Sequence, residues 1–479
     1  MRLVAFACAI VCFQAGCAIG PSYKRPEVAL PDSYRGNLQT DDAMTLADLP
    51  WWKVFEDPVL VDLISEALNK NLNLEIAVAR TEQAYRQSRA VRSEFYPQVS
   101  FDGSAGRSRS PVVPQPGTSL TYTNYAGALN VAWEVDIWGR IRRASESARA
   151  QLLASEDFQR GILLSVVADV ASLYFALLDL DTSLAVAKEA VSAFDDTLEL
   201  FTRKYEGGIA SKLQVSRAAA SRAQATALVP AIEIQIAALE NQLSVLLGRL
   251  PGKIPRGERL NDQPLPQLPA GLPSALLERR PDIRRAEQDV IASNAEVGVA
   301  MGNFLPRVGL VSFWGGASED LEGLASGSTS LWNLAGELSG PLFRGGLLYS
   351  QYKTRQALWE ESRSEYELTA LNAFAEVSSL IVENRLRKSQ RAALETEVKQ
   401  LRESVRLSLI RYDQGLANYF EVLEAQQQLY PAEINLSEVR LEEQLSMVKL
   451  YRALGGGWSL GLDWRVSENP GSEKPGSTP

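Results

Sequence analysis

An unbroken row of apolar residues, spaced alternately four and three apart, extends from Val166 to Tyr205. Its members are Val166, Val170, Leu173, Leu177, Leu180, Leu184, Ala187, Val191, Phe194, Leu198, Phe201 and Tyr205. The mean period of about 3.5 residues is the pattern of a coiled-coil seam. No proline interrupts residues 139–205, so the sequence predicts one helix of about 65 residues, roughly 100 Å long. An ordinary globular core is much shorter than such a helix.

The end of this predicted helix occurs twice in the chain. The stretch RKYEGGIASKLQVSRA begins at Arg203, and IRYDQGLANYFEVLEA begins at Ile410. The segment FYPQVSF at Phe95 likewise returns as FLPRVGL at Phe304. Because the offset is similar across both halves, we interpret the chain as an internal duplication.

A short turn separates two helical patterns in each half. The turn is Gly207-Gly208 in the first half and Gln414-Gly415 in the second. Glycine adopts the left-handed conformation that closes a helix at little cost. We therefore expect each turn to be the tip of a helical hairpin.

The two halves differ in how their long helices are covered. In the second half the seam is interrupted by Asn384, Arg387 and Arg391, so the two copies cannot have identical neighbours. The helix predicted after the first tip, about residues 211–248, is shorter than the long helix beside it. We expect the helix at about residues 72–96 to stack end to end with it, because together they match the long helix in length.

Alternating patterns predict four strands. They lie at residues 98–108, 121–137, 307–316 and about 332–339. In the second of these, the odd positions from Tyr125 onward are mostly apolar, whereas the even ones include Asn130 and Glu134. A period of two gives a sheet with one apolar and one polar face. Open sheet edges are not tolerated in lipid, so we expect a barrel shared between chains.

The N-terminal segment reads as a signal peptide. An apolar run of residues 3–13 is too short for a membrane helix but suits a signal core. Ala15-Gly16-Cys17 resembles a bacterial lipoprotein junction, at which Cys17 becomes lipidated. Gln14 departs from that pattern, and a plain secretory signal is the alternative. No later stretch approaches the ~20 consecutive apolar residues that a membrane helix needs, so we expect no membrane-crossing helix.

Composition excludes several classes of protein. The chain has 49 basic and 58 acidic residues, a net charge of −9, which argues against a nucleic acid partner. It contains no histidine, which removes histidine metal sites, histidine general bases and Ser-His or Cys-His pairs. We therefore expect no enzymatic activity, catalytic residue, metal site or cofactor.

Several stretches, taken in order, resemble the TolC-like outer-membrane factors, and most closely their OprM-like and NodT-like lipoprotein branch. These stretches are WWKVFEDPVLVDLI at Trp51, FYPQVS, WEVDIWGR, RRPDIRRAEQ at Arg279, FLPRVGL, GPLFRGG and RYDQGLANYFEVLEAQ. Each motif is weak alone, but the ordered set is specific and covers nearly the whole chain.

The resemblance implies a mixed α+β membrane protein. Long α-helical hairpins would form a periplasmic α-barrel, and four strands per chain would enter a trimeric twelve-stranded outer-membrane β-barrel. It implies the outer-membrane channel of a tripartite efflux system, with a periplasmic adaptor and an inner-membrane RND-type pump as partners. The channel would be lipid-anchored, palmitate-bearing and passive, and its role would be multidrug resistance.

The predicted organisation follows the duplication. We expect a signal peptide at 1–16, a lipid-anchored wrapping segment at 17–57, a first repeat at 58–250, a Pro-rich linker at 251–273, a second repeat at 274–457 and a C-terminal tail at 458–479.

Functional residues are expected at both tips. We expect Gly207, Gly208, Gln414 and Gly415 to form adaptor-docking tips, because they are duplicated and glycine-dependent.

Carried over from the resemblance, Phe420, Glu421 and Glu424 would narrow the periplasmic gate. The two carboxylates are three residues apart and therefore share a helix face. Since a ring of carboxylates repels itself, closure would rest on other contacts, involving Tyr412 or Arg411.

Two alternatives stay open at this point. One is the outer-membrane channel of an ATP-driven type I protein secretion system, against which the lipoprotein signal argues. The other is a periplasmic structural coiled coil, which explains the heptads but not four amphipathic strands in matched positions. The sequence identifies neither the substrates nor the particular pump and adaptor.

Overall fold

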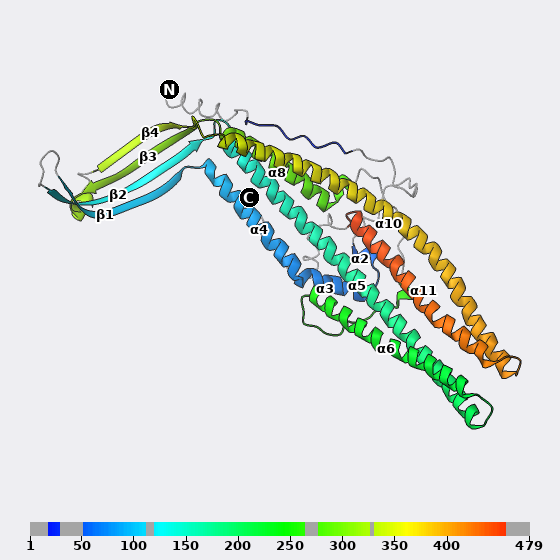
Figure 1. Ribbon diagram of the computed structural model, residues 1–479. Coiled ribbons are helices and arrows are strands. Elements are labelled where there is room, and N and C mark those ends of the chain that lie inside the picture. Colours follow the sequence, from blue (N-terminus) through cyan, green and yellow to red (C-terminus); the bar gives the residue numbers. More distant parts are fainter. Residues whose placement is uncertain (1–17, 29–50, 112–118, 264–275, 326–329, 457–479) are drawn as a thin grey trace, which may run out of the picture. The chain divides into compact units, whose positions relative to one another are not determined.

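The computed structural model describes residues 18–28, 51–111, 119–263, 276–325 and 330–456 (Figure 1). Their contacts divide the chain into two compact units. The first unit takes in residues up to Glu27, Arg80–Glu156 and Arg285–Leu368, and the second takes in the remainder.

Helices make up most of the described chain. They are α2 (Trp51–Val54), α3 (Pro58–Lys70), α4 (Leu72–Arg92), α5 (Arg140–Glu206), α6 (Lys212–Leu246), α7 (Leu276–Arg279), α8 (Pro281–Gly302), α9 (Leu321–Ala325), α10 (Leu347–Asp413) and α11 (Tyr419–Ala453), with 3-10 turns at Ser93–Phe95 and Leu260–Asp262. The prediction of one long helix over 139–205 is confirmed by α5. The helices of the second half have the same lengths as those of the first: α5 and α10 both have 67 residues, and α6 and α11 both have 35.

The first unit contains one antiparallel sheet. Its strands are β1 (Gln98–Pro111), β2 (Ser119–Val135), β3 (Arg307–Ser318) and β4 (Ser330–Ser339). They pair in chain order, β1-β2-β3-β4, and lie side by side in Figure 1. The four predicted strands are confirmed. All four extend two or three residues further than expected at their hairpin ends, and β2 ends at Val135 rather than at residue 137.

The register gives this sheet two different faces. Leu129 lies opposite Phe101 on one side and Trp314 on the other, and Trp314 in turn lies opposite Trp332. Residues in one row share a face, so these four large side chains point the same way. Phe101 is 71% and Trp332 74% exposed. A monomeric water-soluble protein rarely leaves such a continuous apolar face uncovered.

The core of the second unit forms around the middle of α5. Val170, Tyr174 and Leu177 are fully buried there, among side chains from α3, α6, α10 and α11. The expectation that no later stretch has the composition of a membrane helix is wrong. By length and composition α5 qualifies as a membrane-crossing helix, but more than half of its most apolar window is buried inside the protein. Those apolar residues form a protein core.

A buried carboxylate ties the predicted linker to this core. Asp57 is 2% exposed and caps the first turn of α3. It also accepts hydrogen bonds from the Tyr174 hydroxyl at 2.8 Å and from Gln263 Nε2 at 2.7 Å. The same Tyr174 oxygen accepts from the backbone N–H of Gly257 at 2.8 Å. The Pro-rich segment is therefore fixed to α3 and α5 at this point.

The polar interruption of the second seam has its own partners on α11. Arg391 Nε lies 2.6 Å from Glu443 Oε2, and Arg387 Nη1 lies 2.5 Å from Glu442 Oε2. Asn384 donates to the Ser446 hydroxyl at 2.9 Å. This part of the α10–α11 hairpin is joined by ion pairs rather than by apolar packing, which confirms that the two halves have different neighbours.

The short helices meet end to end, as predicted for α4 and α6. Asn71 caps α4 through the N–H of Leu74 and donates its side-chain amide to the carbonyl of Leu246 at 2.8 Å. In the second half, Arg280 donates to the carbonyl of Ala453 at 2.9 Å where α8 begins and α11 ends. Each joint satisfies carbonyl groups that a helix end leaves without partners.

Candidate functional site

The first hairpin tip is a glycine-closed helix end. The N–H of Ile209 donates to the carbonyl of Lys204 at 2.8 Å, and that of Gly208 donates to Tyr205 at 2.9 Å. This pair of bonds is the Schellman motif. Gly208 has φ of +74°, which L-residues with side chains rarely adopt. Ser211 and Gln214 then form a capping box that starts α6.

The second tip has the same geometry. The N–H of Leu416 donates to Arg411 at 2.8 Å, and that of Gly415, with φ of +72°, donates to Tyr412 at 2.9 Å. Asn418 caps α11 through the N–H of Phe420. Within the two tips, Gly208 and Gly415 are the residues with positive φ, which explains why Gln414 can stand where the first tip has Gly207.

Both tips expose apolar side chains. Ile209 is 81% and Leu213 61% exposed at the first tip, and Leu416 is 68% and Phe420 50% exposed at the second. In a Schellman motif the residue after the glycine usually packs back onto its own helix. Here Ile209 and Leu416 stay exposed instead. The duplication has therefore placed the same apolar surface on both tips.

An aromatic cluster joins the two hairpins just behind the tips. The Phe201 ring on α5 meets the Tyr419 ring on α11 edge to face, with centroids 5.0 Å apart. Tyr419 meets Tyr412 of α10 in the same way at 4.8 Å. Further from the tips, the Phe194 and Tyr430 rings repeat this contact, with centroids 5.8 Å apart. Pairs of this kind contribute about 1 kcal/mol each beyond the area that they bury.

Two polar contacts reinforce this cluster. The Tyr419 hydroxyl lies 2.6 Å from Thr197 Oγ1, and Thr197 is fully buried. Burial also raises the pKa of Tyr419, so its hydroxyl stays protonated. On the tip side, Lys204 Nζ donates to the Tyr412 hydroxyl and lies over the Tyr412 ring. These contacts link α5 with α10 and α11.

The predicted gate residues occupy the exposed side of the first turns of α11. Val422 and Leu423 are buried, whereas Phe420, Glu421 and Glu424 are exposed. Glu421 forms an exposed ion pair with Arg411 at 3.6 Å.

The guanidinium group of Arg217 lies 5.6 Å from the Phe420 ring centroid. The structure thus brings Phe420 close to Arg217 of α6, and Glu421 close to Arg411 of α10. Arg217 and Thr197 carry no signal in the sequence, since their partners lie about 200 residues away in the chain.

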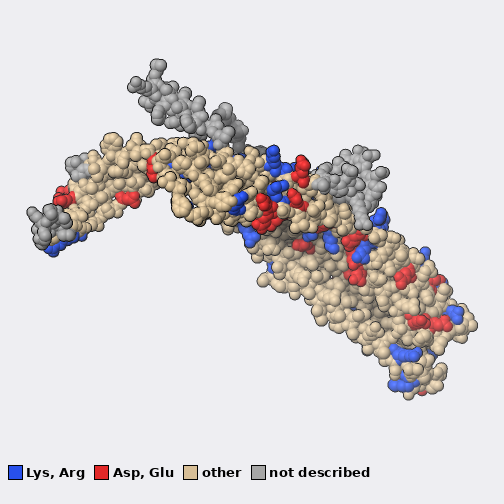
Figure 2. All heavy atoms as spheres, turned by 45° about the horizontal axis from the view of Figure 1, so that its top comes forward, with Lys and Arg blue, Asp and Glu red and all other residues tan. Residues whose placement is uncertain are grey.

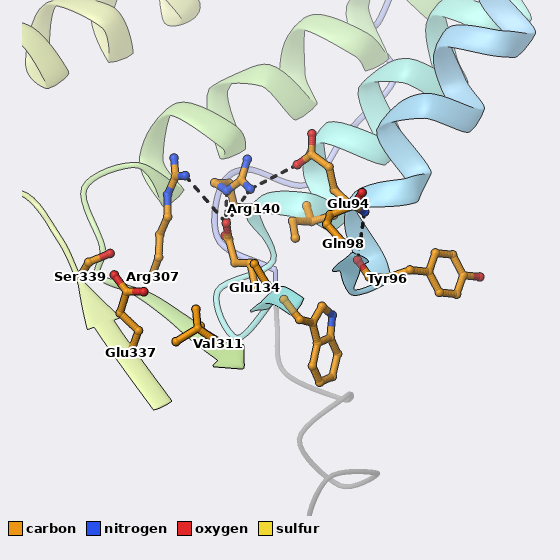
Figure 3. Close-up of a pocket in the computed structure, with 13 residues that line it drawn as sticks. Glu94, Tyr96, Gln98, Glu134, Arg140, Arg307, Val311, Glu337 and Ser339 are labelled. Carbon is orange, nitrogen blue, oxygen red and sulfur yellow. Dashed lines mark hydrogen bonds and ion pairs between the residues drawn. The ribbon is translucent and has the colours of Figure 1, made fainter. Parts of the chain in front are cut away.

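The stretch WEVDIWGR is the junction between β2 and α5 (Figure 3). Asp136 accepts from the N–H groups of Ile141 and Arg142 at 3.0 Å each and so starts α5. Trp138 Nε1 donates to the carbonyl of Pro306 at 2.7 Å. These bonds fix the point at which strand becomes helix.

An open pocket of about 310 Å³ lies beside this junction. Glu134 faces two guanidinium groups in it, Arg140 at 3.0 Å and Arg307 at 3.8 Å (Figure 3). Arg140 also pairs with Glu94 at 3.3 Å. Glu134 and Glu337 flank Gly309 in one row of the sheet, so this cluster lies on the polar face of the sheet.

The predicted lipidation residue, Cys17, lies outside the described residues. The chain next to it is held closely against the β2–α5 junction. Ile19 donates its N–H to Trp138 at 3.0 Å, and Arg143 donates to the Ile19 carbonyl at 3.1 Å. A Cβ on Gly139 would lie 2.6 Å from Ala18 Cα, so this approach requires glycine.

Comparison with known proteins identifies the family. The outer membrane efflux protein family matches residues 63–249 and 272–456. The solvent efflux pump outer membrane protein SrpC of Pseudomonas putida is 33% identical over 452 residues, which cover 93% of this chain and 96% of that protein. The cation efflux system protein CusC of Escherichia coli is 29% identical over 449 residues, covering 92% and 96%.

Solved structures show the same fold. The outer-membrane channel OprN superposes with a TM-score of 0.85 at 27% identity, covering 92% of this chain and all of that one. The open state of the Neisseria gonorrhoeae MtrE outer membrane channel superposes with 0.83 at 27% identity, covering 92% and 99%. The predicted channel fold, outer-membrane location and efflux role are thereby confirmed, and an adaptor and an inner-membrane pump are implied as partners. The chain belongs to the outer membrane efflux protein family, whose members are transport channels and not enzymes.

Proposed function

We propose that three copies of this chain close a shared twelve-stranded barrel in the outer membrane and continue as a helical tunnel in the periplasm. The observation that carries the proposal is the exposed apolar face of the sheet, to which Phe101, Trp314 and Trp332 belong. Within the described sheet, β1 and β4 are edge strands. Lipid does not tolerate unpaired edges, and a second copy supplies the missing partner for each.

The duplication supports the proposed organisation of the chain. Residues 58–250 and 274–457 form the two repeats, and each ends its long hairpin with a 67-residue helix, a glycine tip and a 35-residue helix. A signal peptide, an N-terminal segment lipidated at Cys17, a linker at 251–273 and a tail at 458–479 complete the assignment.

The two tips dock the periplasmic adaptor of an RND-type pump. Ile209 and Leu416 support this role, because each stands exposed on a rigid, glycine-closed turn. Exposed apolar side chains at matched positions suit a partner that meets all the tips of an assembly in a similar way. In a trimer, two tips per chain give a ring of six such contacts.

The second tip forms the gate. Glu421 and Glu424 point to the exposed side of α11 in each chain, so a trimer would gather up to six carboxylates near one axis. Carboxylate rings attract cations and repel each other. The ion pair of Glu421 with Arg411 and the cation–π contact of Phe420 with Arg217 supply the compensating positive charge. One relative is named as part of a solvent efflux pump and another as part of a cation efflux system. This difference fits a channel whose substrates are selected by the pump.

The test is export in a host that lacks its own efflux channels. The chain is expressed with the adaptor and pump genes found nearest to its own gene. We expect outer-membrane fractionation, heat-modifiable migration on a gel, and increased tolerance of small toxic compounds. Secretion of a protein substrate without such tolerance would instead favour a type I secretion channel. Migration in the periplasmic fraction alone would contradict the proposal.

A further inference from the structure

The outer rim of the sheet carries two arginines on the face that is apolar elsewhere. Going along β1, this face presents Val99, Phe101, Gly103 and Ala105, and then Arg107 and Arg109. All of these residues are exposed. Figure 2 shows basic side chains gathered at the hairpin end of the strands. The side chains on this face of β1 therefore change from apolar to cationic between Ala105 and Arg107.

The neighbouring strand changes at the same level. Thr123 and Thr121 lie opposite Arg107 and Arg109 on the same face of the sheet. Beyond Tyr125, the apolar side chains of β2 are Leu120 and Tyr122, which belong to the other face. On β2 the polar and apolar faces are therefore exchanged at the rim. The pairing of β1 with β2 is unbroken from Gln98 to Pro111, so no irregularity in the register causes the exchange.

The height of this change matches the hydrocarbon layer. From Val135 to Tyr125 the strand takes ten steps, about 34 Å along its axis and about 25 Å along the membrane normal at the usual tilt. Outer-membrane barrels have an apolar band about 25 Å tall. Arg107 and Arg109 come directly after that band, at head-group level. An arginine on a lipid face costs several kcal/mol at mid-membrane but almost nothing at the interface.

We propose that Arg107 and Arg109 form a binding site for the phosphate groups of a phosphorylated glycolipid in the outer leaflet. The proposal rests on the proposed membrane barrel. The two guanidinium groups are two residues apart on one strand face, about 7 Å along the strand. Guanidinium groups bind phosphate oxygens in a bidentate fashion, and two such groups suit a ligand with more than one phosphate.

Other polar and charged groups lie at the same end of the sheet. Arg109 Nε donates to Ser119 Oγ at 2.6 Å, which keeps other N–H groups of that guanidinium available. Exposed carboxylates follow the end of β3 at Glu319, Asp320 and Glu322. Glu322 belongs to α9, which contacts β2 and β3, and Leu324 of α9 lies 4.0 Å from where a Cβ on Gly127 would stand. Positive charge at this end of the sheet therefore lies on β1, and negative charge lies on the segment that follows β3.

The experiment is native mass spectrometry of the full chain in detergent, titrated with bisphosphorylated lipid A. The double variant Arg107→Gln/Arg109→Gln should bind it about tenfold more weakly than wild type. The control Arg86→Gln/Arg89→Gln removes the same charge from exposed positions on α4 and should bind as wild type. The variant Arg107→Lys/Arg109→Lys keeps the charge and should lose less than the glutamine variant. Dephosphorylated lipid A should bind wild type and variants equally.

Equal binding of bisphosphorylated lipid A to wild type and to the glutamine variant would overturn the inference. Phosphatidylglycerol that competes as well as lipid A would overturn its assignment to the outer-leaflet glycolipid. Each protein is first checked for outer-membrane fractionation and heat-modifiable migration. A wild-type chain that fails this check contradicts the membrane barrel itself, whereas a chain that passes it and shows no arginine-dependent binding contradicts only the lipid site.

Discussion

Replacing Tyr419 by phenylalanine should loosen the two hairpins from each other while their packing is kept. The Thr197 hydroxyl donates its only hydrogen to the carbonyl of Ala193 at 2.8 Å. The Tyr419 hydroxyl is therefore the donor in the 2.6 Å bond to Thr197. The variant removes that donor and leaves the edge-to-face contacts of the ring with Phe201 and Tyr412 in place.

The size of the effect follows from the burial of this bond. A buried hydrogen bond contributes about 1 kcal/mol net, which is about fivefold in the equilibrium between joined and separated hairpins. If the proposed trimer opens only when all three chains release this contact, the contributions add to about 3 kcal/mol, or about a hundredfold. The spontaneous open probability of the channel should rise by a factor between these two values.

Single-channel recording in planar bilayers measures that probability. The matched control is Tyr430→Phe, which removes a hydroxyl from the same interface. The Tyr430 ring is buried against Phe194, but among the described residues its hydroxyl has no hydrogen bond across the hairpins. An open probability that is the same in both variants would refute the reasoning that the Thr197 bond holds the tips together.

Three further outcomes are expected. Gly208→Val and Gly415→Val each force a β-branched residue to positive φ, at a cost of about 1–3 kcal/mol. Both variants should still insert in the outer membrane, but drug export should fall. Normal export in both variants would exclude the tips as the docking site. Labelled palmitate should enter wild type and not Cys17→Ser, and equal labelling would end that assignment. Burial raises the pKa of Asp179 from 3.8 to about 6, so the contribution of this group to stability should fall as pH rises from about 4 to about 6. Asp179→Asn should therefore change the pH dependence of thermal unfolding in that range relative to wild type, and an identical pH dependence would contradict this prediction.

The periodic features of the chain could be predicted because neighbouring residues encode them. The 3.5-residue seam and the absence of proline over 139–205 together predicted α5 to within a residue at each end, and the alternation around Leu129 predicted the two faces of the sheet. The glycine turns were predictable for the same reason. Gly208 and Gly415 each follow a long helical pattern, and few other residues tolerate the backbone conformation found there.

The contacts that hold these elements together could not be predicted, because no local pattern encodes them. Thr197 and Tyr419 are 222 residues apart, and Asp57 and Gln263 are 206 apart. The apolar middle of α5 has the composition of a membrane helix, and only the burial of residues such as Tyr174 shows that it is a protein core. The gate residues came from resemblance alone, and the cations opposite them, Arg217 and Arg411, became evident only in the structure.

Ion conduction through the purified full-length protein in a planar bilayer tests the central claim most directly. The account predicts a cation-selective channel whose selectivity weakens in Glu421→Ala/Glu424→Ala, because the carboxylate ring is lost. It also predicts a higher conductance in Phe420→Ala, because a half-exposed ring at the second tip is removed. Selectivity and conductance equal to wild type in both variants would show that the constriction lies elsewhere. A protein that inserts in the outer membrane and conducts no ions would contradict the channel itself.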